Sequence, residues 1–223
     1  GQFQRAYEEA EDALQYRKKG NFNYEVSIEL MFYAKYFKGE YIVAANLLER
    51  LVPSEDQTAN FRSGKRSYLL AATYFMKEDF QATLKFLSLI NPIEQDKEGW
   101  NLGIKILQIM TDIELNELDS ATAKSEALRK YFENGNGTAN QRAQMINNIF
   151  LDLSYNGYSF KTTYQERKSF VEMLGEKLGD LSWQIKSSEM VIFHQWFFAK
   201  AFRQKFIQKV ESFQIEISAV KTK

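Results

Sequence analysis

The sequence contains no cysteine and only one histidine, His194. A chain without cysteine cannot form disulfides, thiolate nucleophiles or Cys-based zinc sites, and one imidazole cannot supply a histidine-rich metal site. We therefore expect no metal, no cofactor and no catalytic residue. His194 has no nucleophile motif near it, so we interpret it as a packing or surface residue.

Residues that form turns are also scarce, with 2 prolines and 11 glycines in 223 residues. A fold of many short strands would need more of both at its turns. Hydrophobic residues make up 44% of the chain and charged residues 26%, which is typical of a packed globular protein. The composition therefore predicts an all-α fold with a hydrophobic core.

Neither sign of charge is in excess, because 29 basic residues balance 29 acidic ones. A balanced chain has no general electrostatic attraction for nucleic acid, so we expect no nucleic-acid partner. No apolar run reaches the ~20 residues that cross a bilayer, which predicts no integral membrane segment. The start of the chain lacks the apolar core of a secretory signal, so we expect a soluble, cytoplasmic protein. Because the first residue is Gly1, a removed signal segment stays open as an alternative.

Two segments of the sequence match each other at an offset of 39 residues (77 − 38 = 39). Lys38-Gly39-Glu40-Tyr41 aligns with Lys77-Glu78-Asp79-Phe80, and Pro53 aligns with Pro92. In each segment an amphipathic helix leads to this corner, and a second helix leads from the corner to a proline that stops it. The pattern predicts consecutive antiparallel helix hairpins.

The remaining sequence extends this helical pattern. A fainter third hairpin, with its corner at residues 117–119, brings the hairpin region to residues 25–133. Residues 1–24 contain an N-terminal helix, and residues 138–223 contain further helices. We expect the last of them to begin near Ser182 and to continue past Phe213 as a long capping helix. No linker rich in proline or serine divides the chain, so we expect a single domain of about ten helices.

The first two hairpins resemble the tetratricopeptide repeat. Leu70-Ala71 and Tyr74 reproduce its first-helix pattern in the second hairpin, and Ala44 and Pro53 reproduce its second-helix pattern in the first. The resemblance is best over residues 25–92, and the period is 39 residues rather than the usual 34. It implies hairpins stacked into a right-handed superhelix, whose concave surface binds peptides or partner proteins.

The resemblance also indicates which residues would contact a partner. In the family the first helix of each pair lines the concave surface, so residues of these helices outside the packing set are the expected contacts. These residues are Glu29, Tyr33, Tyr36, Lys65, Tyr68 and Phe75. The alternative is that the aromatic residues among them pack between neighbouring hairpins.

The C-terminal helix carries more aromatic residues than one packed face needs. Its candidates for a second interface are Phe197, Phe198, Phe202 and Phe206. Three explanations stay open: burial at the end of the array, a partner or homodimer surface, and contact with a membrane surface through the interleaved basic residues.

These patterns together predict a non-enzymatic scaffold or adaptor that binds a protein or peptide, as part of a larger regulatory or sensory protein. One alternative is a peptide- or ligand-responsive helical regulator with a second interface on the C-terminal helix. An enzyme that gathers carboxylates and tyrosines from different helices ranks below both.

Overall fold

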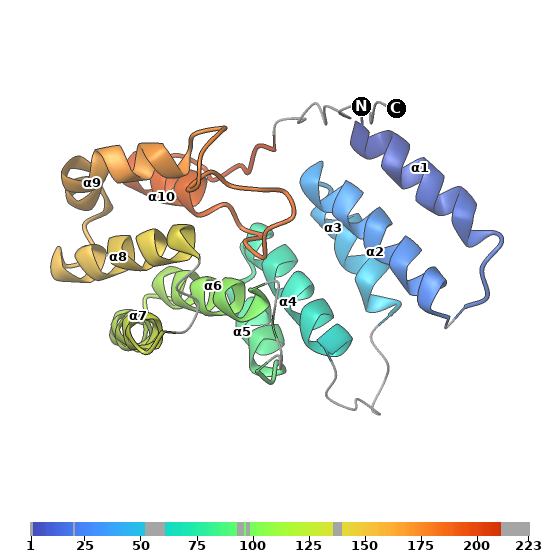
Figure 1. Cartoon of the computed structure of the whole chain (residues 1–223), viewed down its shortest axis with the longest axis horizontal. Coiled ribbons are helices and arrows are strands. Elements are labelled where there is room, and N and C mark those ends of the chain that lie inside the picture. The colour runs from blue at the N-terminus through green and yellow to red at the C-terminus, as the bar shows by residue number, and fades with distance from the viewer. Residues whose placement is uncertain are drawn as a thin grey trace, which may run out of the picture. The chain divides into compact units, whose positions relative to one another are not determined.

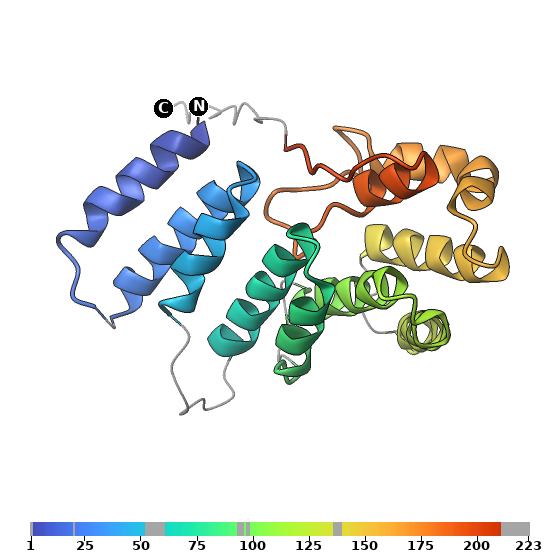
Figure 2. The same ribbon diagram turned by 180° about the vertical axis from the view of Figure 1, so that it is seen from behind.

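All regular secondary structure that the computed structural model describes is α-helical, in ten helices, as the composition predicts (Figures 1 and 2). The described residues are 2–19, 21–51, 61–92, 96, 99–135 and 140–210. They divide into two compact units. The first unit contains the described residues up to Leu47 together with Lys209 and Val210, and the second contains those from 48 to 208. That the whole chain forms one repeat domain stays a prediction.

The first unit is built on two antiparallel helices, α1 (Gln2–Leu14) and α2 (Phe22–Phe37), which pack along each other. The Asn21 side chain caps α2 by accepting a hydrogen bond of 2.8 Å from the Tyr24 N–H. Helix α3 (Tyr41–Glu49) follows after a tight corner, with the rings of Tyr36 and Tyr41 5.4 Å apart. The N-terminal helix predicted within residues 1–24 is therefore confirmed, although it ends at Leu14.

The second unit stacks three antiparallel hairpins. Its helices are α4 (Phe61–Met76), α5 (Phe80–Ser88), α6 (Trp100–Glu114), α7 (Leu118–Glu133), α8 (Gln141–Tyr155) and α9 (Phe160–Leu174), followed by α10 (Phe193–Ala201). Each pair packs together, and the first helices also contact each other in sequence, α4 with α6 and α6 with α8. Helix α10 packs on α9. The predicted stacking of helical hairpins is therefore confirmed within this unit.

The three predicted hairpin corners share one backbone geometry. Gly39, Glu78 and Asn116 lie in the left-handed region, with φ of 80°, 60° and 61°. In each corner the next N–H donates to the carbonyl five residues earlier, at 2.8–3.0 Å. This motif closes the last turn of a helix and usually contains glycine. The internal match therefore reflects a repeated chain reversal, whose third copy is centred just before the predicted residues 117–119.

The prediction of one long C-terminal helix is wrong over most of its length. Only α10 is helical, while residues 175–192 and 202–210 are irregular; Phe213 lies outside the described residues. The helix begins where the Glu189 carboxylate accepts the Phe193 N–H at 2.8 Å. It ends where Arg203 adopts a left-handed φ of 54°. Neither end carries glycine or proline, so the apolar spacing alone did not reveal them.

Candidate functional site

The six residues predicted to line a concave surface lie in different environments. Tyr36, Tyr68 and Phe75 are 0%, 1% and 2% exposed, so they are core residues, and their assignment as partner contacts is corrected. The packing alternative holds for them because their helices are covered on more than one side. The remaining three, Glu29, Tyr33 and Lys65, are half-buried, and a role in binding stays a prediction for them.

In the second unit the chain's own residues 182–192 occupy the surface around Tyr68. The Tyr68 hydroxyl donates to the Ser188 carbonyl and accepts a hydrogen bond of 3.5 Å from the Met190 N–H. Burial raises the pKa of this hydroxyl well above its usual value, so it remains a donor. Ser188 Oγ in turn donates to the Gly99 carbonyl at 2.7 Å. The Tyr68 hydroxyl therefore holds a segment of its own chain and is not available to a partner.

Helix α6 makes room for this segment through Gly103. A Cβ atom at this position would lie 2.4 Å from the Ser188 carbonyl oxygen and 2.8 Å from the Tyr68 hydroxyl. Real Cβ atoms do not approach this closely, so any other side chain would push the segment away from the helix. The close backbone approach explains why glycine occupies a buried helical position.

Arg142 on α8 anchors the same segment at a second point. Its guanidinium forms two hydrogen bonds with Glu189, of 2.6 Å and 2.9 Å, and both side chains are 9% exposed or less. It also donates to the Leu174 and Leu181 carbonyls and contacts Nδ1 of His194 at 3.2 Å. All five N–H groups of the guanidinium therefore have an acceptor, which is what a buried charge needs to be tolerated.

This arrangement assigns the protonation state of His194. Because a guanidinium can only donate, Nδ1 accepts and the imidazole proton lies on Nε2. Burial and, to a smaller extent, the positive charge of Arg142 together lower the pKa of His194 to about 4, while Glu189 opposes this shift. At neutral pH the ring is uncharged and completes the hydrogen bonds of Arg142, in agreement with the prediction of a packing residue.

Side chains also satisfy three further backbone groups of the segment. Trp183 Nε1 donates to the Glu189 carbonyl at 2.9 Å. The Gln208 amide donates to the Met190 carbonyl at 3.0 Å and accepts from the Ile192 N–H at 2.8 Å. Buried irregular backbone needs such partners because it lacks the internal bonds of a helix. Sequence reasoning missed Trp183 and Gln208, because their neighbours in sequence give no sign of these contacts.

The residues predicted to form a second interface also differ in their exposure to solvent. Phe197 is 0% exposed, so its assignment to an interface is corrected, and Phe206 is half-buried. In contrast, Phe198 and Phe202 are 41% and 46% exposed. Their ring centroids are 4.4 Å apart, and Tyr164 of α9 lies 5.9 Å from the first and 5.0 Å from the second. We call Tyr164, Phe198 and Phe202 the aromatic cluster.

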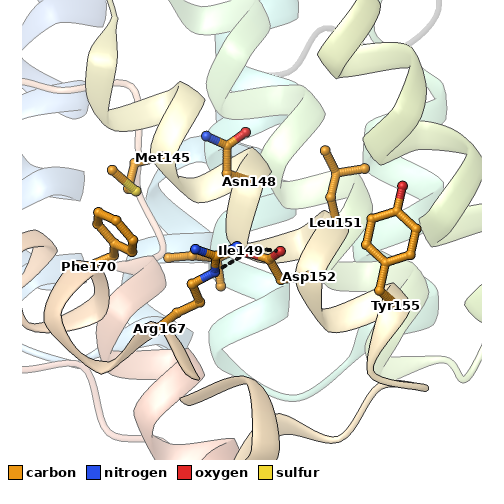
Figure 3. A pocket seen from close by; sticks show the side chains of 8 residues that line it. All are labelled: Met145, Asn148, Ile149, Leu151, Asp152, Tyr155, Arg167 and Phe170. Carbon is orange, nitrogen blue, oxygen red and sulfur yellow. Dashed lines mark hydrogen bonds and ion pairs between the residues drawn. The ribbon is translucent and has the colours of Figure 1, made fainter. Parts of the chain in front are cut away.

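A pocket of about 290 Å³ lies between α8 and α9 (Figure 3). It is lined by Met145, Asn148, Ile149, Leu151, Asp152, Tyr155, Arg167 and Phe170. Its charged groups pair with each other, because Arg167 contacts both oxygens of Asp152 at 2.7 Å and 2.9 Å. The pocket thus offers mainly apolar and aromatic surface to a ligand.

Within the described ranges, no three histidine, aspartate or glutamate side chains are grouped as metal ligands. None of the helices described is both long enough and apolar enough to cross a bilayer. Compared with family models, with curated proteins and with solved structures, the chain has no significant match. The resemblance to the tetratricopeptide repeat therefore stays a prediction that rests on the residues themselves.

Proposed function

We propose that this chain is a non-enzymatic helical scaffold that binds a segment of a partner protein through the aromatic cluster. The observation that carries the proposal is the pair of adjacent rings, Phe198 and Phe202, each exposed by more than two fifths. Grouped aromatic side chains offer a large, rigid surface whose burial drives association, and such residues are common at the energetic centres of interfaces.

Residues 182–192 favour the aromatic cluster as the binding surface, because they already cover the first helices of the second unit around Tyr68. A partner at Tyr68 would have to displace residues 182–192, whose side chains Trp183, Met190, Val191 and Ile192 are all buried. Such a displacement would also break the Arg142–Glu189 pair. The aromatic cluster can bind without either cost, because its rings are already exposed.

The proposal is tested by replacing Phe198 and Phe202 together with serine in the full chain. We expect the amount of partner protein recovered from the native cell, measured by mass spectrometry, to fall at least about tenfold. A fall of this size is expected if the partner needs at least one of the two rings. The control is Leu89→Ser, which removes an apolar side chain that is 57% exposed at the end of α5. It should leave recovery unchanged.

Circular dichroism of both variants separates loss of binding from loss of folding. We expect each variant to keep the helicity and melting temperature of the wild-type protein. Recovery of the same partners by wild type and by the double variant would refute the proposal, and so would the recovery of none by wild type.

A further inference from the structure

Helix α10 and the residues that follow it, which carry two rings of the aromatic cluster, have charged side chains of one sign only. From Phe193 to Gln208 the sequence contains three basic residues, Lys200, Arg203 and Lys205, and no acidic residue. Lys200 is neutralised by Glu114 of α6, at 2.9 Å. Arg203 and Lys205 are exposed and form no ion pair with any residue that the structure describes.

Helix α9 adds positive charge beside the third ring. Lys161 stands three residues before Tyr164, so the two lie on one face of α9, while Lys168 follows the kink at Arg167. Both lysines are exposed, and Lys168 is 3.8 Å from Glu172. Lys161 has no ion pair within the described part of the chain. We call Lys161, Arg203 and Lys205 the basic rim.

The charge of the basic rim indicates which kind of partner could cover the aromatic cluster. A symmetric dimer through this surface would bring the rims of both copies together, and like charges in contact oppose association. An anionic membrane would gain only about 1 kcal/mol from each basic group near its surface. Phe198 and Phe202 also pack on one another, with their ring centroids 4.4 Å apart, so each residue keeps less than half of its surface exposed for contact with a bilayer.

We infer that the partner segment is acidic, with aspartate or glutamate beside apolar or aromatic side chains. Its apolar side chains cover the aromatic cluster, and its carboxylates meet the basic rim. Such charge complementarity speeds encounter and excludes wrong partners. The inference rests on the proposed function and adds the chemistry that the partner must have.

The test is selection of binders to the full chain from a random library of displayed peptides. We expect the selected peptides to be enriched in aspartate and glutamate next to leucine, phenylalanine or tryptophan. Fluorescence anisotropy of selected peptides should show affinity that falls several-fold when salt is raised from about 0.05 M to about 0.2 M, because salt screens exposed charges.

Two charge-reversal variants locate the effect. Arg203→Glu with Lys205→Glu should weaken the selected peptides at least about tenfold by turning attraction into repulsion. Lys18→Glu with Lys19→Glu changes net charge equally at two exposed residues before α2 and should leave affinity unchanged. The Phe198→Ser and Phe202→Ser double variant should lose binding of the same peptides.

The outcomes separate the inference from the proposed function. Selected peptides that need Phe198 and Phe202 but show no acidic enrichment would overturn the acidic partner and leave the scaffold proposal standing. A library that yields no binder, or binders indifferent to the two rings, would overturn both. Binding of the full chain to vesicles containing phosphatidylserine, or a concentration-dependent dimer, would also overturn the inference if the Phe198→Ser and Phe202→Ser double variant abolished it.

Discussion

The hairpins of the second unit and residues 188–192, which precede α10, are both buried, yet different interactions hold them. Each hairpin satisfies its backbone through helical hydrogen bonds and reverses at a local corner, as at Glu78 and Asn116. The segment instead depends on side chains from other elements, chiefly Tyr68 and Arg142. The backbone of the regular elements therefore does not depend on particular side chains for its hydrogen bonds, whereas that of the irregular segment depends on a few specific polar residues.

Removal of the Arg142 guanidinium should give the largest loss of stability. A small loss would contradict the contrast between the hairpins and the irregular segment. Arg142→Met leaves the Glu189 carboxylate buried without a counter-charge, so we expect a loss of about 3–5 kcal/mol in the free energy of unfolding. Urea denaturation measures it. Arg167→Met is the control, since it removes an ion pair to Asp152 whose arginine side chain is 41% exposed, and it should cost under about 1 kcal/mol. Equal losses for the two variants would show that the segment needs no buried anchor.

Protonation of His194 should loosen the same anchor in acid. Its folded-state pKa of about 4 lies below the ordinary value of 6.5, because burial and Arg142 oppose a charged ring while Glu189 favours it. The unfolded chain therefore binds the proton more tightly, and stability present above pH 6.5 falls by up to about 3 kcal/mol as the pH drops toward 4. His194→Gln should remove this part of the pH dependence. Identical pH profiles of unfolding for wild type and variant would contradict the assignment.

Substitutions at the hairpin corners should give the smallest changes in stability. They test whether each corner depends only on local backbone conformation. Glu78 adopts a left-handed conformation that glycine accepts without strain, so Glu78→Gly should stabilise the chain by about 1 kcal/mol. Gly39→Ala should destabilise it by a similar amount, for conformational reasons alone, because no atom lies within 4 Å of the added methyl group. Melting temperatures measure both. A fall in the melting temperature of Glu78→Gly would show that the Glu78 side chain has a role beyond the corner.

The helices and corners could be predicted because their causes are local. The match between residues 38–41 and 77–80 identified the chain reversals, since each depends on a few consecutive residues. The exposure of neighbouring rings could not be predicted in this way. Phe197 and Phe198 are adjacent in sequence, yet Phe197, beside Phe160 of α9, is fully buried, whereas Phe198, beside Tyr164 of α9, stays 41% exposed.

The irregular segment shows the other limit of sequence reasoning. Buried irregular chain is as apolar as a buried helix, so residues 182–192 carried no local signal against a helical prediction. Their conformation depends on Tyr68 and Arg142, which are distant in sequence, and on Gln208, which follows α10. The predicted partner role of Tyr68 is wrong because residues 182–192 cover this side chain, and the sequence around Tyr68 carries no sign of a contact 120 residues away.

The tethers of this segment also bear on how the second unit is completed during synthesis. The Tyr68–Ser188 and Arg142–Glu189 bonds join residues 120 and 47 positions apart. In a simple repeat array each hairpin is finished once its neighbour has formed. Here the helices from α4 to α8 leave the ribosome before residues 182–192, which cover them. Their faces around Tyr68 and Gly103 therefore remain exposed to solvent until those residues emerge. A nascent chain that ends before Ser182 would leave those faces exposed, and such fragments are natural substrates for chaperones and proteases.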